Sequence, residues 1–232
     1  MVMRNIPKIL YQQAFFLNLR VMSQFLPLFP LSLVVFPGEQ LRLHIFEERY
    51  KQLTHECVED NAPFGIPTVI DQSVVSIATE VEIMTVDKRY ASGEMDVTTR
   101  GKRRFTIEQF YRVSPDKLYP GGEVSFLDDD QTASPELQQE IFQLLEQLHE
   151  ALGIQKNVAE TPDDVRAYDI GHHIGLTLKQ EYELLTLQTE LDRLMFIKQH
   201  LTGILPVVQE TERMKARAKL NGHYKNIVPP NF

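Results

Sequence analysis

The side chains with the right chemistry for nucleophilic catalysis or metal binding form two small groups. His172 and His173 are adjacent, so on a helix their imidazoles point about 100° apart and do not suit one metal ion. His55 and Cys57 are two positions apart, and on a helix such side chains also diverge. Neither group has the spacing of a catalytic pair or a zinc site. We therefore predict no catalytic residue, no metal site and no cofactor.

Nucleotide chemistry would need a glycine-rich phosphate loop. The stretch Gly101-Lys102 has Asp96 where the pattern G-x-x-x-x-G-K-[ST] requires its first glycine, and Arg103 where it requires a hydroxyl. The sequence contains neither G-x-G-x-x-G nor G-x-S-x-G. Because these motifs are missing, we expect a protein that is not an enzyme.

Two charged runs have a possible binding function. The basic run from Arg100 to Arg104 would suit phosphate or RNA, but strand alternation sends Arg103 and Arg104 to opposite faces, and no aromatic side chains interleave with the cations. We therefore favour a solvated strand face. The acidic run Asp128-Asp129-Asp130 lacks the spaced ligands and the glycine of a calcium loop, which favours an exposed linker.

The composition is that of an ordinary folded protein. The chain has 232 residues, of which 43% are hydrophobic and 24% charged, and its formal net charge is −8. No run approaches the roughly 18 apolar residues that span a bilayer. Net acidity disfavours nucleic acid as a partner. The single cysteine suits a reducing compartment, so we predict a cytoplasmic location.

Charge divides the chain into segments. Residues 1–24 contain three cations and no acidic side chain, yet serine is too rare for a typical mitochondrial leader, so we interpret them as an N-terminal extension. Residues 125–209 carry 15 acidic and 5 basic side chains, whereas residues 1–124 are nearly neutral. This change indicates a boundary near residue 125.

The first half has the two-residue period of β-strands. Leu41, Leu43 and Ile45 alternate with polar residues, and Ser92-Gly93 separates two β-rich runs, as in a hairpin. One helix interrupts the strands, with an apolar face on which Cys57 is a buried structural thiol; the face consists of Phe46, Tyr50, Leu53 and Cys57. The pattern predicts a small coiled sheet or partly open barrel.

The second half has the period of helices. The first runs from Ser134-Pro135 to Gly153, the second from Thr161-Pro162 to Gly175, and a third begins at Thr177 with a capping box. A fourth helix spans Glu190 to Thr202 and ends at Gly203, with an apolar side formed by Leu191, Leu194, Met195, Ile197 and Leu201. A last, cationic helix follows from Pro206 to Leu220. We expect it to dock on the acidic bundle, the alternative being a recognition handle.

A known family matches the opening of this pattern. The residues are Leu26-Pro27-Leu28-Phe29-Pro30-Leu31, then Val34-Val35-Phe36-Pro37-Gly38, then Leu41 through Tyr50. They closely resemble the P-L-F-P-L, V-x-F-P-G and L-x-L-x-I-F-E-x-R-Y elements of the LON substrate-binding domain, the N-terminal domain of ATP-dependent Lon proteases. Gly101 to Ile107 resembles its G-x-x-R-F-x-I strand. Gln180 to Leu185 and Leu191 to Leu194 resemble its looser helical motifs.

The resemblance implies an α+β fold, in which a β-rich, PUA-like pseudo-barrel is followed by an α-helical bundle. We divide the chain into an N-terminal extension (1–24), a β-rich subdomain (25–127), a helical bundle (128–205) and a C-terminal helix and tail (206–232). The chain leaves no room for the ATPase or Ser-Lys protease domains of Lon, so it resembles the stand-alone LON-domain proteins. The lone Cys57 also excludes the paired C-x-x-C zinc module of cereblon-type relatives.

The implied function is a non-catalytic protein-interaction module that binds exposed or unfolded polypeptide segments, or a partner of the proteolytic machinery. Recognition would use an apolar groove or an exposed strand edge. The alternative is a PUA-like module that binds a small ligand or RNA through Arg100 to Arg104. The sequence leaves the oligomeric state open.

The motif residues themselves also have structural roles in our interpretation. Phe46 and Tyr50 would anchor the first helix on the sheet, Arg49 would bond backbone carbonyls or a carboxylate of another element, and Pro37-Gly38 would form a turn. We assign the following motif positions to the scaffold: Pro37, Gly38, Ile45, Phe46, Glu47, Arg49, Tyr50, Gly101, Arg104 and Phe105.

Overall fold

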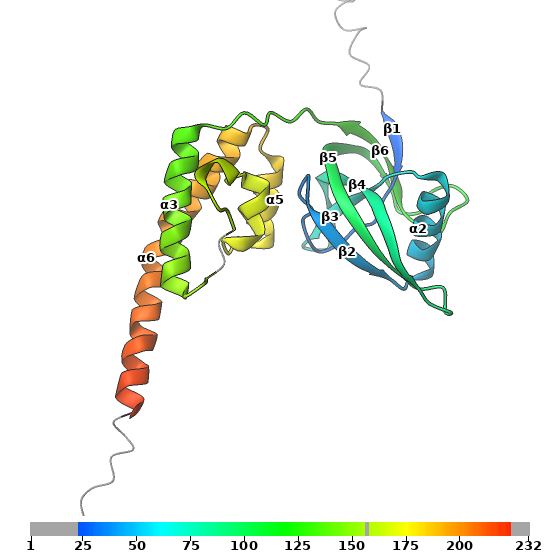
Figure 1. Cartoon of the computed structure of the whole chain (residues 1–232). Coiled ribbons are helices and arrows are strands. Elements are labelled where there is room, and N and C mark those ends of the chain that lie inside the picture. The colour runs from blue at the N-terminus through cyan, green and yellow to red at the C-terminus, as the bar shows by residue number, and fades with distance from the viewer. Residues whose placement is uncertain (1–22, 156–157, 224–232) are drawn as a thin grey trace, which may run out of the picture.

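The computed structural model of the chain describes residues 23–155 and 158–223, with side chains described as far as residue 218 (Figure 1). Its first half is one antiparallel sheet in the order β1-β6-β5-β4-β3, with β2 paired to β5. The strands are β1 (Gln24–Pro27), β2 (Gln40–Ile45), β3 (Phe64–Ile70), β4 (Ser73–Arg89), β5 (Met95–Tyr111) and β6 (Gly121–Phe126). Helices follow the sheet, so the predicted α+β class is confirmed.

The segment after β1 closes this sheet into a pseudo-barrel. Leu28 donates its backbone N–H to the carbonyl of Pro120, just before β6, at 2.9 Å. Phe29 donates to Gly65 of β3 at 2.8 Å, and Val69 of β3 donates to Leu31 at 2.7 Å. The two ends of the sheet are therefore joined by the proline-containing stretch Leu26 to Leu31, which satisfies backbone groups that would otherwise be free at both edges.

Strands β4 and β5 form the long hairpin predicted at Ser92-Gly93. Gly93 has φ +83°, a conformation that glycine adopts without strain. The β4–β5 register shifts at three places. Bulges of this kind bend long strands, and the bend lets β5 pair with β2 along its first half and with β6 along its second.

Helix α2 (Glu48–Asp60) buries Tyr50, Leu53 and Cys57, as predicted. The expected anchoring by Phe46 is wrong, because this side chain is 60% exposed. Glu47 is the N-cap with an extended backbone, so Phe46 precedes the helix and the four-residue spacing does not place it on the Tyr50 face. Phe29 takes that place, with its ring 3.8 Å from the ring of Tyr50.

Two of the predicted helices are confirmed with their caps. Helix α3 (Pro135–Leu152) begins at Ser134, whose hydroxyl accepts the N–H of Leu137 at 3.3 Å, and it ends at Gly153 with φ +66°. Helix α5 (Leu178–Thr186) begins with the predicted capping box of Thr177 and Gln180.

The second predicted helix is wrong. In its place are η1 (Pro162–Asp164), α4 (Ala167–Ile170) and η2 (Gly171–His173). Val165 and Arg166 are extended and interrupt the helical path. The interruption lets the backbone N–H of Ala167 reach the buried carboxylate of Glu190 at 2.8 Å. A tertiary hydrogen bond here outweighs the local helical preference.

Helix α6 (Glu190–His223) corrects the expected end at Gly203, because it continues through Gly203 and Pro206. Gly203 does not have the positive φ of a C-terminal cap. Leu191 and Met195 are exposed rather than inside the bundle. The second half of α6 projects away from the body (Figure 1), so the expected docking on the chain's own bundle is wrong for its described part. The apolar residues from Tyr224 to Phe232 lie outside the described residues.

Separate cores fill the barrel and the helical half. The barrel core contains Val35, and the helical core contains its two neighbours, Val34 and Phe36. Because adjacent side chains of an extended segment point in opposite directions, the stretch before Pro37 inserts into both cores. It is one of the connections that fix the two halves together.

Candidate functional site

Phe36 links the barrel to the helical half. Its fully buried ring lies 5.1 Å from the ring of Tyr168 and 4.5 Å from that of His172. The turn after it is held to β5, since Gly38 donates its N–H to the carbonyl of Gly101 at 3.0 Å. A Cβ atom on Gly101 would lie 2.3 Å from the carbonyl oxygen of Phe36, so this close approach requires glycine.

A second connection is a buried ionic network. Arg104 of β5 donates to the carbonyls of Leu185 and Leu187, at 2.8 Å each, and to Asp129 at 3.0 Å. Arg193 of α6 bonds Asp129 at 2.6 Å. It also bonds Glu190 at 2.9 Å and the Tyr168 hydroxyl at 2.9 Å. Both guanidinium groups are fully buried, and the carboxylates neutralise them.

This network corrects the expected exposed linker at Asp128 to Asp130. Asp129 is only 19% exposed and joins the two arginines. The sequence contained one usable signal, since an apolar helix face that includes Arg193 requires a buried partner for its charge. The partner itself lies 64 residues away and has no local signature.

Two further cations of the basic run, Lys102 and Arg103, are paired on the barrel surface. Lys102 pairs with Glu82 at 2.9 Å, and Arg103 pairs with Glu80 at 2.8 Å. The Arg103 guanidinium also lies 3.4 Å from the centroid of the Phe126 ring. The predicted alternation is confirmed, because the Arg103 side chain is 53% exposed and that of Arg104 is buried.

The other motif side chains lie in or beside the barrel. Ile45 and Phe105 are buried in it. Arg49 pairs with Glu47 at 2.7 Å and lies over the Tyr50 ring at 4.6 Å. The partner of Arg49 is therefore two residues away in the chain, and the expected bond to a carbonyl or to another element is wrong.

The reactive side chains are not arranged for catalysis. Burial raises the pKa of the Cys57 thiol to about 12, so it is not a nucleophile at neutral pH. His55 lies on the exposed side of α2 and pairs with Glu59 at 3.2 Å. Within residues 23–155 and 158–223, no group of three His, Cys, Asp or Glu side chains is arranged to hold a metal ion.

His172 is a clamp between the two halves. Its Nε2 lies 3.1 Å from Glu39, which precedes β2, and its Nδ1 lies 2.8 Å from Glu181 of α5. Burial alone would lower the pKa of the imidazole, but the hydrogen bonds to the two carboxylates outweigh it and raise the pKa to about 9. His172 is therefore protonated at neutral pH and ties the two carboxylates together.

A cleft opens beside this clamp. Its volume is about 480 Å³, and its walls come from the start of β2 and from the α4–η2 region. Leu33, Leu41 and Tyr168 give the cleft an apolar side, while Glu39 and Asp169 give it an acidic side. Burial raises the pKa of Asp169, with Arg166 opposing that shift.

Strand β2 runs from this cleft and has a ladder partner on one edge only, since among the described strands it pairs with β5 alone. Beyond its last residue, Phe46 exposes its ring next to His44. The His44 Nδ1 lies 2.6 Å from Asp96 of β5, and the Tyr90 hydroxyl donates to the same carboxylate at 2.7 Å. The arrangement is an open strand edge with an apolar feature near each end.

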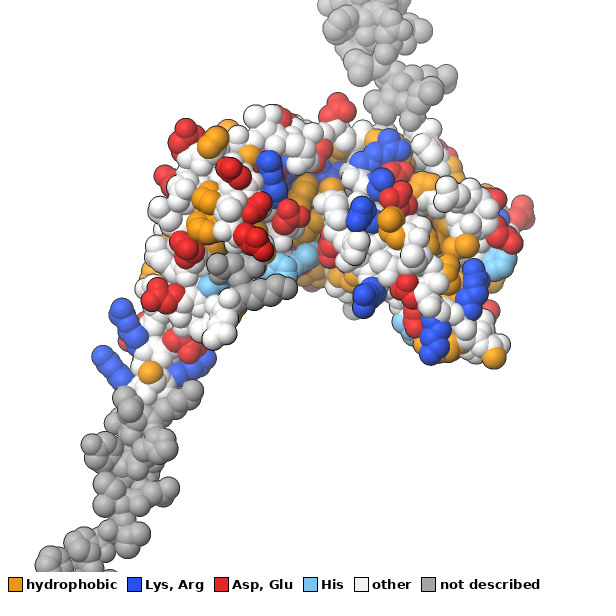
Figure 2. Space-filling model, viewed as in Figure 1, with side chains coloured by type: hydrophobic (Ala, Val, Ile, Leu, Met, Phe, Trp, Pro, Cys, Tyr) orange, Lys and Arg blue, Asp and Glu red, His pale blue; other side chains and the backbone are white. Residues whose placement is uncertain are grey.

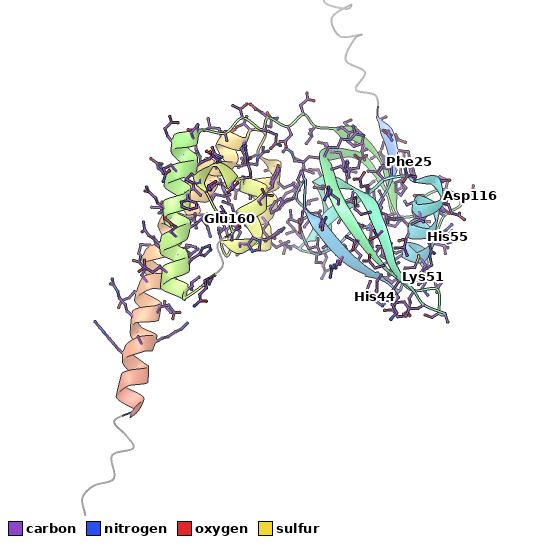
Figure 3. All side chains as sticks on the ribbon, viewed as in Figure 1. Phe25, His44, Lys51, His55, Asp116 and Glu160 are labelled. Carbon is purple, nitrogen blue, oxygen red and sulfur yellow. The ribbon has the colours of Figure 1, made fainter. Side chains whose placement is uncertain are left out.

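A groove of about 710 Å³, lined by several charged side chains, lies between α2 and the tip of the β4–β5 hairpin. Lys51, His55 and Asp116 line it and are labelled in Figure 3, near His44. Lys51 donates to Glu48 at 2.9 Å and to the carbonyl of Ser92 at 3.1 Å. This lysine holds the hairpin tip against the helix.

Comparison with known proteins gives the family. The model of the ATP-dependent protease La (LON) substrate-binding domain matches residues 25–203. The chain belongs to this family. The substrate-binding role for which the LON domain is named therefore applies to this chain at the level of the family.

Solved LON domains share its fold. The chain is 28% identical to the Lon N-terminal domain protein from Xanthomonas campestris, over 74% of this chain and 95% of that one, with a TM-score of 0.58. It is similar in fold to the N-terminal domain of Mycobacterium avium complex Lon protease, with 18% identity over 77% and 98% of the two chains and a TM-score of 0.55. A search of curated proteins finds no significant match.

The LON motif residues lie mostly at structural junctions. The P-L-F-P-L stretch closes the barrel, Phe36 enters the helical core, and Arg104 enters the ionic network. Phe46 is the exception, because this apolar motif residue is 60% exposed. None of the described helices is both long enough and apolar enough to cross a membrane.

Proposed function

We propose that this LON-domain protein binds extended polypeptide segments without catalysing a reaction, and that the segments pair with β2. The single open edge of β2 carries the proposal. Backbone groups at such an edge are free to bond another strand, and strand addition of this kind is a common mode of peptide recognition.

The register identifies the backbone groups available for pairing. Gly101 of β5 donates its N–H to the Glu39 carbonyl at 2.9 Å, and the Thr99 hydroxyl donates to the Leu41 carbonyl at 3.1 Å. Because N–H and C=O groups alternate in direction along an antiparallel strand, the backbone groups of Gln40, Arg42 and His44 point away from β5. An added strand would bond to these groups.

Side chains near both ends of β2 favour apolar segments. Leu33, Leu41 and Tyr168 line the cleft at the beginning of the strand, and Phe46 lies exposed beyond its end. Folded proteins bury their apolar extended segments, whereas unfolded proteins expose them. The site therefore suits exposed or unfolded polypeptide, including segments presented by a partner of the proteolytic machinery.

The RNA-binding alternative is not favoured. Lys102 and Arg103 pair with carboxylates of β4, and Arg104 is buried. This leaves the half-buried Arg100 as the cation of the run that has neither of these roles, so few charges remain for phosphate. We place the protein in the cytoplasm on the basis of its single cysteine. The subdomain limits at residues 127 and 205 remain our proposal; the second lies within α6.

The proposed function is tested by blocking the β2 edge. The substitution Arg42→Pro removes an outward N–H and leaves the ladder with β5 intact, because proline is tolerated on edge strands where its nitrogen faces solvent. Arg42→Ala removes the same side chain and keeps the N–H. Binding of fluorescein-labelled β-casein is measured by anisotropy for both variants, after circular dichroism has shown that they melt like the parent chain.

We expect Arg42→Pro to weaken casein binding by about tenfold or more, through lost backbone hydrogen bonds and a steric block, and Arg42→Ala to bind like the parent. Equal binding by the parent and the folded Arg42→Pro variant would overturn the β2 site. Hydrolysis of casein or ATP by the purified chain, abolished by a point substitution, would overturn the non-enzymatic function.

A further inference from the structure

The projecting half of α6 has an uncovered apolar stripe. Val207 and Met214 are 66% and 56% exposed. Phe196 is half-buried, and a Cβ atom on Gly203 would meet nothing within 4 Å. At 100° per residue, Phe196, Gly203, Val207 and Met214 lie within about 20° of one line along the helix. The four positions of the stripe therefore lie on one straight line along the solvent side of α6.

The stripe starts in a groove on the body. This groove has a volume of about 740 Å³ and lies between α3 and the first half of α6, with Leu137, Leu187, Met195 and Phe196 among its lining residues. The solvent side of α6 thus has an apolar groove near the start of the helix and exposed apolar residues of the stripe in its projecting half.

The spacing of the stripe is symmetric. Phe196 and Met214 are equally far in sequence from Leu205, and so are Gly203 and Val207. Two antiparallel α6 helices that cross at Leu205 would therefore place Phe196 of each copy against Met214 of the other, and Gly203 against Val207. A two-fold interface requires a surface that is complementary to itself in this way. The small Gly203 allows the two helices to approach closely.

Charge supports the same arrangement. The projecting end carries three cations, Arg213, Lys215 and Arg217, against two carboxylates, Glu210 and Glu212, which pair with Arg213 and Lys215. Figure 2 shows Lys and Arg side chains at that end and acidic side chains over the helical half. In the antiparallel pair, this end lies beside the start of the other copy's α6 and α3. Two carboxylates are exposed there, Asp192 and Glu136, which are hydrogen-bonded by the hydroxyls of Thr189 and Ser134. Opposite charges would meet at both ends of the interface.

Two α6 helices in a parallel pair would not bring opposite charges together. It would place Glu210 against Glu210 and Arg217 against Arg217 along the seam, and it would bring both bodies to the same half of the helix pair. Like charges facing each other are unfavourable. The antiparallel arrangement avoids both problems.

We propose that the chain forms an antiparallel homodimer through α6, with Met214 of each copy seated in the α3–α6 groove of the other. The interface is separate from β2, so each copy keeps its open strand edge. The dimer would carry two peptide sites and bind polypeptides with two exposed segments more tightly than a single copy does.

Sedimentation of the full chain over micromolar concentrations tests the dimer. The variant Val207→Glu/Met214→Glu places two charges per copy in the apolar seam and should weaken dimerisation by about 100-fold or more. Its melting temperature should stay close to that of the parent at concentrations where both are monomeric, because both side chains are exposed in one copy. Leu191→Glu is the matched control, since Leu191 is an exposed apolar residue on the other side of α6.

Crosslinking tests the direction of the helices. Mixed Phe196→Cys and Met214→Cys chains should form a disulfide between unlike copies, while Met214→Cys alone should not crosslink to itself. The buried native Cys57 does not interfere. Three outcomes would each overturn the proposal. The parent chain could stay monomeric up to about 100 μM, the dimer could survive Val207→Glu/Met214→Glu, or Met214→Cys could crosslink to itself.

Discussion

Arg104 of the barrel and Arg193 of the helical half bond the same carboxylate oxygen, Oδ1 of Asp129, at 3.0 and 2.6 Å. Neither guanidinium has access to solvent. One carboxylate in the connection between β6 and α3 therefore joins strand β5 to helix α6. The relative position of the two halves depends on this group together with Phe36 and His172.

Removal of the shared carboxylate should destabilise the fold strongly. Asp129→Ala leaves two buried cations with one fewer counter-charge, and we expect the free energy of unfolding to fall by about 3 kcal/mol or more. Urea denaturation gives this difference. Asp128→Ala is the control, because the exposed Asp128 contributes only its backbone carbonyl to Arg104 and should change stability by less than about 0.5 kcal/mol. Similar losses for the two variants would contradict the role of Asp129.

The two motif phenylalanines should behave in opposite ways. Phe36→Ala leaves a cavity in the helical core and should cost about 3–5 kcal/mol of unfolding free energy. Phe46→Ala removes an exposed ring, so it should change stability by less than about 0.5 kcal/mol while weakening casein binding. Thermal melts and anisotropy titrations measure both effects. A stable Phe36→Ala variant, or full casein binding by Phe46→Ala, would contradict the assignment concerned.

Stability should decrease at alkaline pH because of His172. Its pKa is about 9 in the folded chain, above its ordinary value of 6.5. The contribution of the clamp is therefore fully present below pH 6.5 and is lost as the pH rises through about 9. Urea unfolding of the parent and of His172→Gln should differ most at the acidic end of this window and converge above it. His173→Gln, an exposed neighbour, should follow the parent; a constant difference between the parent and His172→Gln would contradict the linkage.

Cys57 should react only when the chain unfolds. Its thiol is buried and its pKa is raised to about 12, so little thiolate is present at pH 8. We expect modification by a thiol-specific disulfide reagent to be slow in the native chain and fast in concentrated urea. Rapid stoichiometric modification of the native chain would show that the thiol is accessible and would contradict its structural role.

Local signals predicted the elements that depend on local interactions. Helix α3 begins and ends at Ser134 and Gly153 because side-chain and backbone caps act within one turn. The sequence failed where distant contacts decide the outcome. The predicted second helix is interrupted at Val165 and Arg166, next to the bond from Ala167 to the distant Glu190.

The candidate site shows the same division. The family motif drew attention to Phe36, Gly101 and Arg104, which we assigned to the scaffold, and the structure places them at the junction of the two halves. Their partners Asp129 and His172 were not predicted, since each lies far along the chain from the motif residue that it contacts and has no pattern of its own. The open edge of β2 could not be predicted from the sequence either, because the order of the strands depends on the whole sheet.

Amide hydrogen exchange at β2 is the most direct test of the proposed function. Residue-resolved rates are measured by NMR on the isotope-labelled chain, free and saturated with β-casein. If casein adds a strand, the outward amides of Gln40, Arg42 and His44 should exchange more slowly by a factor of about ten or more. The amides of Leu41 and Leu43 point toward β5, so their exchange rates should not change. Unchanged exchange at Gln40, Arg42 and His44 in the casein-bound chain would contradict strand pairing at β2.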